Sequence, residues 1–165
     1  MSAAGRALLT VILLPVMIVM VPVAGFAIGV EALRGVYLRL RFRLRWGPER
    51  IALLVYSESP YWKTYIEERW LPLVADRAVV LNWSERRAWM PTRRLEAAVF
   101  RHYAGQREFN PVAIVLAKGN RAEVIRFWQP FRDFRHGKVH TLRQAEERLG
   151  SLLGIRLSAS EPRAA

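Results

Sequence analysis

The sequence predicts a mixed α/β domain that follows a single transmembrane helix. The chain has 165 residues, which is enough for one domain and an anchor but short for two ordinary domains. It opens with a long uncharged stretch. Four short β-rich segments then alternate with segments of helical periodicity, and that order is typical of an α/β fold.

The composition limits the chemistry that this chain can perform. It contains no cysteine, so disulfide bonds, thiol redox chemistry and cysteine-ligated metal centres are excluded. Its 26 lysines and arginines outnumber 14 acidic residues and give a formal net charge of +12. An excess of this size favours anionic partners, such as lipid headgroups or nucleic acid.

The uncharged stretch from Ala7 to Val30 predicts a membrane span. As a helix it reaches about 36 Å, which exceeds the ~30 Å hydrocarbon core of a bilayer. A cleaved signal peptide is the alternative, but its apolar region is normally only ~7–15 residues long. Within the span, Gly25 and Gly29 form a GxxxG pair that could bring two copies together as a homodimer.

The charges that flank the span predict its direction. Arg6 is the only basic side chain that precedes it, whereas several arginines follow it closely. Because basic flanks stay on the cytoplasmic side, we expect a single-pass protein of the inner (cell) membrane with a cytoplasmic C-terminal domain. The arginines that follow the span within the next twenty residues are Arg34, Arg39, Arg41, Arg43, Arg45 and Arg50.

The segment from Tyr37 to Trp46 alternates arginine with apolar residues. Period-two alternation is typical of a strand with one wet face, although a helix continuing from the span is an alternative. In either case the segment follows the membrane closely, so we expect contact with anionic headgroups. The residues predicted at the membrane surface are Arg39, Arg41, Arg43, Arg45 and Trp46.

The predicted organisation is an anchor over 1–31, a basic juxtamembrane segment over 32–49, a domain over 50–157 and a disordered tail over 158–165. Within the domain, Ser59 and Pro60 predict the start of a helix. Thr141 and Gln144 form a capping box. The expected elements are strands over 50–57, 78–82, 112–117 and 122–127 and helices over 60–70, from about 91 to Gly105, and from Thr141 onward, with a hairpin turn at 118–120.

This order, βαβαββα with a mixed four-stranded sheet, resembles the thioredoxin-like fold over roughly Arg50 to Leu153. The first helix opens directly after the first core strand, where that family carries its dithiol. Pro111 directly precedes the third core strand, where the family carries a cis-proline. The turn Lys118-Gly119-Asn120 is similar to the turn of the family's hairpin.

The departure from the family is that no cysteine occupies the dithiol position. Disulfide exchange requires a thiolate, so the resemblance implies a redox-inactive domain. What it retains is a groove at the start of the first helix, and we predict binding there by Ser57, Ser59, Tyr61 and Pro111. Such a site suits an extended peptide or an anion.

No residue is assigned a catalytic or metal-binding role, and no cofactor is expected. His136 and His140 have a spacing that can mimic metal ligands, but Gly137 between them indicates a loop. We therefore expect a protein-binding or scaffolding module, with an unidentified protein partner. The alternatives are a small-molecule enzyme that uses the Ser59–Pro111 groove, and a module that binds anionic lipid or, less favoured, nucleic acid.

Overall fold

The computed structural model describes residues 3–105, 110–117 and 121–156, and the side chains from residue 17 onward. The chain divides into two compact units, Met1–Tyr37 and Leu38–Ala165. The hairpin turn predicted at 118–120 and the predicted tail over 158–165 lie outside the described residues.

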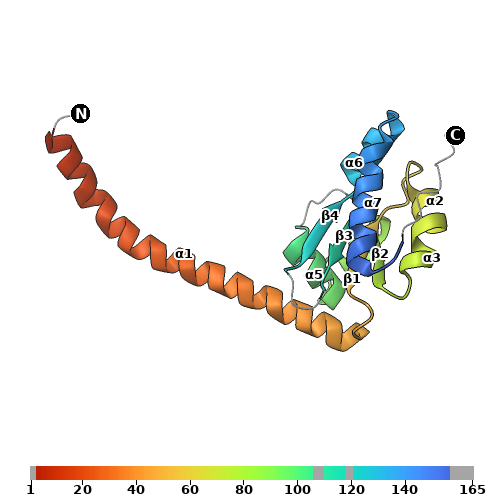
Figure 1. Cartoon of the computed structure of the whole chain (residues 1–165). Helices are drawn as coiled ribbons and strands as arrows, with labels where there is room; N and C mark the ends of the chain where they lie inside the picture. Colours follow the sequence, from red (N-terminus) through yellow and green to blue (C-terminus); the bar gives the residue numbers. More distant parts are fainter. Residues whose placement is uncertain (1–2, 106–109, 118–120, 157–165) are drawn as a thin grey trace. The chain divides into compact units, whose positions relative to one another are not determined.

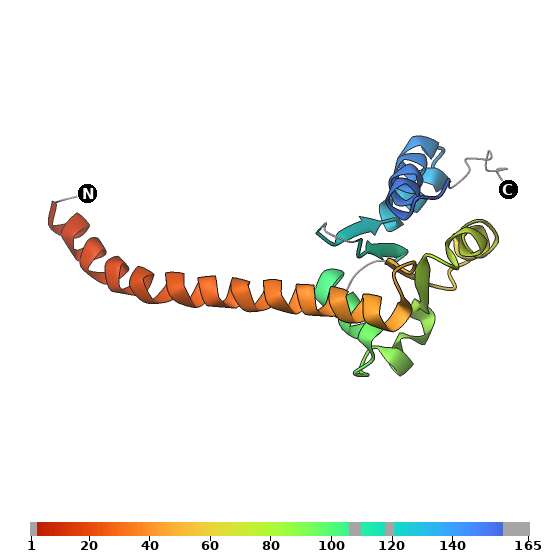
Figure 2. The ribbon, with the colours of Figure 1, turned by 60° about the horizontal axis from the view of Figure 1, so that its bottom comes forward.

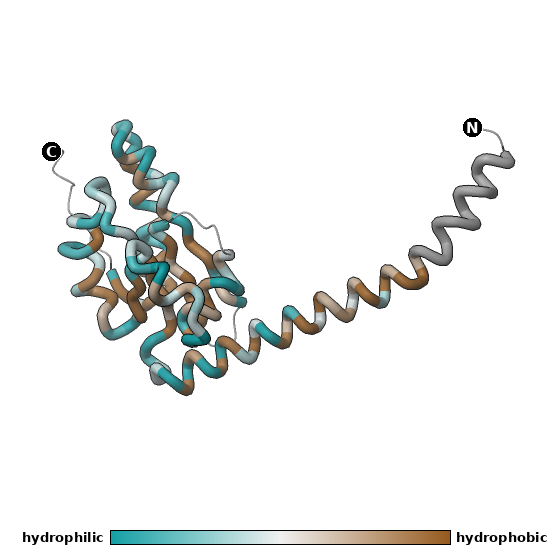
Figure 3. The backbone as a smooth tube through the Cα atoms, turned by 180° about the vertical axis from the view of Figure 1, so that it is seen from behind, coloured by the Kyte–Doolittle hydropathy of each residue, from teal (hydrophilic) through white to brown (hydrophobic). Residues whose placement is uncertain are grey.

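The first unit consists of helix α1, which extends over Ala3–Trp46 and so reaches into the second unit. Among the described residues, the helical stretch Met17–Trp46 contains an 18-residue window that is apolar enough to cross a membrane, with a mean hydropathy of 1.7. Large apolar side chains of this stretch in the first unit are exposed: Phe26 is 76% exposed and Ile28 is 70% exposed. Figure 3 shows the apolar character of this part of the tube. The exposure excludes a buried core helix.

The last turns of α1 correct the prediction of a strand over 37–46, because this segment is helical and belongs to the second unit. Leu38 and Phe42, four residues apart, are buried, whereas Leu40 and Leu44 are 56% and 77% exposed. A strand would have placed Leu40, Phe42 and Leu44 on one face. Extending an existing helix avoids the cost of a new nucleus, and the burial of Leu38 and Phe42 stabilises the extension.

The second unit is built on a four-stranded sheet of order β2-β1-β3-β4 (Figure 1). Strands β1 and β2 are parallel, with Leu54 opposite Val80, while β3 runs antiparallel to both β1 and β4. The predicted mixed sheet, with a parallel first pair and an antiparallel hairpin, is confirmed. The strands extend over Ala52–Tyr56, Ala78–Asn82, Val112–Val115 and Glu123–Arg126.

Alternate residues of the central strands pack on opposite faces of the sheet. Leu54 and Ala113 join one core cluster, while Leu53 and Ile114 join the other. Both faces are covered by helices, so β1 and β3 are buried along their whole length. This explains why their sequences are continuous apolar runs rather than alternating ones.

On one face of the sheet, Ile66 and Trp70 from the crossover helix pack with Leu142 and Leu149 from the last helix. On the other face, Phe100 packs with Phe42 and Trp89. Figure 2 shows α5 and α7 on opposite sides of the sheet. The first face is covered by α2 (Lys63–Tyr65), α3 (Leu71–Val74), α6 (Trp128–Arg135) and α7 (Val139–Leu153), and the second by α5 (Leu95–Tyr103) and the end of α1.

The crossover helix begins later and ends later than the sequence predicts. It starts at Lys63 rather than at Pro60, although the Ser59 carbonyl already accepts from the amide of Lys63 at 2.9 Å. It continues past Pro72 to Val74 rather than ending at Trp70. A π-helical segment, Ile66–Trp70, directly precedes the proline. Its wider turn accommodates a residue that has no amide to donate.

Three further helices differ from the prediction. Helix α5 starts at Leu95 rather than near Met90-Pro91, after a short helix α4, Arg86–Trp89. It ends at Tyr103, and Gly105, the predicted stop, follows the last turn with a φ of +87°. Helix α6 was not predicted.

Helix α7 begins at Val139, two residues before the predicted capping box. The Thr141 hydroxyl donates to the Lys138 carbonyl at 3.2 Å, so it does not cap the helix as predicted.

Candidate functional site

The three residues predicted to bind at the start of the crossover helix are held by local contacts. The Ser57 hydroxyl accepts from the Trp62 indole at 3.2 Å. The Ser59 hydroxyl accepts from the Tyr61 amide at 3.5 Å, a long hydrogen bond. Tyr61 is 57% exposed, and the guanidinium of Arg135 stacks over its ring, 3.8 Å from the ring centre.

Pro111 is buried at the start of β3. The Asn110–Pro111 peptide bond is cis, as the family resemblance implies. Val55 pairs with Val112, so the same antiparallel register continued by one residue places Pro111 opposite Tyr56. The fold therefore brings Pro111 to the end of β1, one residue from Ser57. The Pro111 carbonyl accepts from the Phe127 amide at 2.8 Å.

A polar network joins the ends of the two parallel strands next to this point. The Asn82 side chain donates to Glu58 at 3.0 Å, and the Ser84 hydroxyl accepts from the Glu58 amide at 3.1 Å. The Tyr56 hydroxyl donates to Glu67 at 2.9 Å. Burial first, and then the Glu67 carboxylate, raise the pKa of Tyr56 to about 12. Tyr56 is therefore a neutral hydrogen-bond donor at physiological pH.

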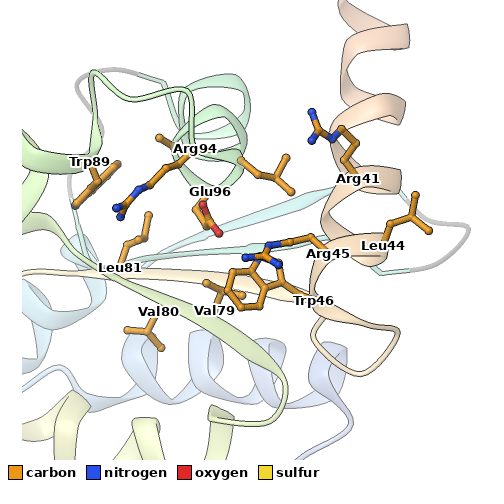
Figure 4. A pocket seen from close by; sticks show the side chains of 12 residues that line it. Arg41, Leu44, Arg45, Trp46, Val79, Val80, Leu81, Trp89, Arg94 and Glu96 are labelled. Atoms are coloured by element: carbon orange, nitrogen blue, oxygen red, sulfur yellow. The ribbon is translucent and has the colours of Figure 1, made fainter.

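A pocket of about 810 Å³ lies elsewhere in the second unit, between the end of α1, strand β2 and the start of α5 (Figure 4). Three arginines and one glutamate line it among apolar side chains, so its charge is net positive. The lining residues are Arg41, Leu44, Arg45 and Trp46 of α1, Val79, Val80 and Leu81 of β2, Trp89 of α4, and Arg94, Leu95, Glu96 and Ala97 at the start of α5.

Aromatic side chains make one wall of this pocket rigid. The Trp89 indole donates to the Asn82 carbonyl at 2.8 Å and its ring packs edge-on against Phe100. On the opposite wall, the guanidinium groups of Arg45 and Arg50 lie 5.3 and 5.6 Å from the centre of the Trp46 ring. Aromatic rings fixed in this way give the pocket a defined shape.

The five residues predicted at the membrane surface do not share one environment. Arg41, Arg45 and Trp46 line the pocket, and Arg43 is half-buried outside its lining. Arg39 lies close to Tyr103. Burial raises the pKa of Tyr103, and the positive charge of Arg39 opposes part of that rise. Three of these residues therefore form part of the pocket wall.

The aromatic and arginine residues of 126–135 pack mainly on the domain itself. Phe127 and Phe131 are buried, and the guanidinium of Arg132 lies 5.0 Å from the centre of the Trp128 ring. His136 and His140 are exposed. In the part of the chain that the structure describes, no group of three histidine or acidic side chains could hold a metal ion.

Comparison with known proteins found no matching family model, no matching curated protein and no matching solved structure.

Sequence reasoning missed the pocket because its walls come from four separate segments. The apolar run of β2 was recognised, but the position of β2 at the edge of the sheet follows only from the strand order. Trp89 and Arg94 had no assigned role. The available signal was the pair Trp83 and Trp89 flanking two arginines, and their rings do pack together with centres 5.9 Å apart.

Proposed function

We propose that this protein is a membrane-anchored, thioredoxin-like domain without redox activity, which binds a partner protein at the inner face of the membrane. The anchor is the apolar part of α1. The arginines that follow it favour a cytoplasmic domain. The binding module is the second unit.

The arrangement of the sheet supports a thioredoxin-like fold. Its order is β2-β1-β3-β4, with one parallel pair and two antiparallel pairs. The crossover helix and α7 cover one face and α5 covers the other. The sequence resemblance implies a mixed four-stranded sheet with helices on both faces, and this arrangement agrees with it. Helix α6, inserted between β4 and α7, is an addition to it.

One observation supports the functional proposal most strongly. The position of the family's dithiol is occupied by side chains that are engaged in hydrogen bonds and ring contacts within the domain. The Ser57 hydroxyl is bonded to the Trp62 indole, and the Trp62 ring packs against Phe131. With no thiol in the chain, electron transfer by disulfide exchange has no reactive group. A rigid domain held at a membrane then acts through its contacts.

The small-molecule enzyme is less favoured. A serine nucleophile needs an adjacent base to take its proton. The Ser57 hydroxyl accepts a hydrogen bond from the indole N–H of Trp62, which cannot serve as that base. The Ser59 hydroxyl accepts from the Tyr61 amide. Neither contact activates a hydroxyl group.

Site-specific photo-crosslinking of the full-length protein in its native membranes tests the proposed function. A photoreactive amino acid is placed at Tyr61 beside the predicted groove, at Val80 in the pocket, or at Arg143, an exposed residue of α7. A protein-binding module gives a discrete cross-linked species from at least one position. The absence of a discrete species from all three positions would contradict the proposal.

A fusion of reporter enzymes to the C-terminus tests the orientation. A reporter that is active only in the cytoplasm should be active, and one that requires export should be inactive. The opposite pattern would place the domain on the outer side and would remove the inner-face part of the proposal.

A further inference from the structure

The pocket described above lies along the free edge of the sheet. In the part of the chain that the structure describes, β2 pairs with β1 alone and is the outermost strand. Val79, Val80 and Leu81 all line the pocket. Successive residues of a strand point to opposite faces, so a pocket touched by three in succession extends around the edge of β2.

The backbone of this edge has groups available for pairing. The amide of Ala52 donates to the Arg77 carbonyl at 3.1 Å, so Arg77 directs its backbone groups toward β1. The backbone amide and carbonyl groups of successive residues in a strand point alternately to its two neighbours. Those of Val79 therefore also point toward β1, whereas those of Ala78 and Val80 point away from β1. Val80 is 36% exposed. One further strand could pair with these groups.

The side chains around the edge favour an acidic partner. Arg45 and Arg94 are both exposed and lie on different walls of the pocket. Together with Arg41 they give the lining three basic side chains, against one acidic side chain, Glu96. The apolar lining between them, including Trp89 and Val79, suits aliphatic side chains. A strand with alternating acidic and aliphatic residues would complement both features.

We propose that the edge of β2 binds an extended acidic segment of a partner protein, which adds to the sheet as a fifth strand. Main-chain hydrogen bonds to Val80 supply affinity, and the arginines and the apolar pocket select the sequence. This inference rests on the proposed protein-binding function and names its surface. A second copy of the chain is a poorer occupant, because its net charge of +12 repels an equally basic surface.

Peptide binding to the full-length chain in nanodiscs of neutral phosphatidylcholine tests this surface. The probe is a fluorescent peptide of about eight residues, a typical strand length, that alternates glutamate with valine. Its counterpart carries lysine in place of glutamate. We expect the glutamate peptide to bind at least about tenfold more tightly than the lysine peptide, because rim charges discriminate between partners in this way. Equal binding of the two peptides would overturn the proposal.

Variants separate pairing at the edge from general attraction between charges. Arg45→Glu combined with Arg94→Glu should weaken binding about tenfold or more. Lys138→Glu combined with Arg143→Glu, an equal change of charge at two exposed positions beside and on α7, should leave it unchanged. Val80→Pro removes an outward amide and should abolish binding.

If the Val80→Pro variant does not fold, a modified peptide tests strand pairing instead. The glutamate–valine peptide N-methylated at alternate residues cannot pair along one edge, so one of its two methylation registers should lose binding. Full binding by both methylated peptides would show attraction without strand addition and would overturn the proposal. Self-association of the chain that Val80→Pro abolishes would also overturn it, because a second copy would then occupy the edge.

The cross-linking experiment distinguishes failure of this inference from failure of the proposed function. A discrete species from Tyr61 with none from Val80 leaves a protein-binding module but refutes the β2 edge as its surface. A species from Val80 together with binding of the glutamate peptide supports both.

Discussion

The indole of Trp70 donates a hydrogen bond to Oε1 of Glu146 at 2.8 Å, joining the crossover helix to α7 across the first face of the sheet. The hydroxyl of Tyr65 donates to the same oxygen at 2.7 Å. Glu146 is only 8% exposed. A single carboxylate oxygen therefore satisfies two donors, and burial with this bond raises the pKa of Tyr65 above its ordinary value.

Replacing Glu146 should destabilise the domain in a way that depends on the oxygen atom. Glu146→Ala leaves the buried Trp70 indole and the half-buried Tyr65 hydroxyl without an acceptor and should cost about 2–4 kcal/mol. Glu146→Gln keeps an oxygen at the same place and should cost about 1 kcal/mol. Thermal unfolding of the full-length chain in detergent, followed by tryptophan fluorescence, measures both. Glu147→Ala, at the exposed neighbouring position, is the control, and equal melting temperatures for the two alanine variants would contradict this role.

Phe42 distinguishes the helical end of α1 from the predicted strand. Its side chain is fully buried in the second core cluster, so Phe42→Ala should cost about 3–5 kcal/mol. Leu40→Ala and Leu44→Ala should change stability by no more than about 0.5 kcal/mol, because both side chains are exposed. The same unfolding experiment measures all three variants. Similar losses for Leu40, Phe42 and Leu44 would instead indicate that the three share one buried face.

The sequence predicted the sheet well because its signals are local and strong. The run Ala52–Tyr56 is apolar at every position and buried at every position. A strand followed by a crossover helix and another strand predicts a parallel pair, and β1 and β2 have that relation. Two strands joined by a short connection must be antiparallel, as β3 and β4 are.

The helix boundaries were predicted less well because tertiary contacts determine them. The Thr141 hydroxyl bonds to the Lys138 carbonyl and does not cap a helix. The Ser59 hydroxyl does accept from the amide two residues on, as a cap does, but the bond is long and the regular helix begins only at Lys63. The period-two pattern of 37–46 coincided with an i, i+4 pair, Leu38 and Phe42, that the domain buries. The pocket could not be predicted at all, since it exists only where α1, β2, α4 and α5 meet.

Ser57 tests whether the predicted groove is structural or reactive. Ser57→Ala removes the acceptor of the Trp62 indole and should cost about 0.5–1.5 kcal/mol. Because this hydroxyl has a structural partner, we expect cellular function to persist once protein levels are equalised. Quantified complementation beside a thermal unfolding measurement checks both statements. Loss of function in a variant whose stability is unchanged would favour the enzyme alternative.

Tyr56 predicts how stability depends on pH in the alkaline range. Burial and the bond to Glu67 raise its pKa to about 12, while a tyrosine in the unfolded chain has a pKa of about 10. The folded state therefore holds this proton more tightly than the unfolded state. The stability that Tyr56 contributes is complete below about pH 10 and is lost as the pH rises from about 10 to about 12. The raised pKa of Tyr65 acts in the same direction.

Tyr56→Phe isolates this effect from the other alkaline transitions. The variant cannot ionise at position 56, so its unfolding midpoint should fall less steeply between about pH 10 and pH 12 than that of the wild-type chain. Tyr61→Phe, which removes the hydroxyl of an exposed ring, is the matched control. Unfolding of the full-length chain at a series of pH values, with tyrosinate absorbance recorded in parallel, gives the slope and the ionisation together. If Tyr56→Phe and the wild-type chain lose stability at the same rate, the Tyr56–Glu67 hydrogen bond does not hold the proton, and the end of β1 is more open to solvent than its burial indicates.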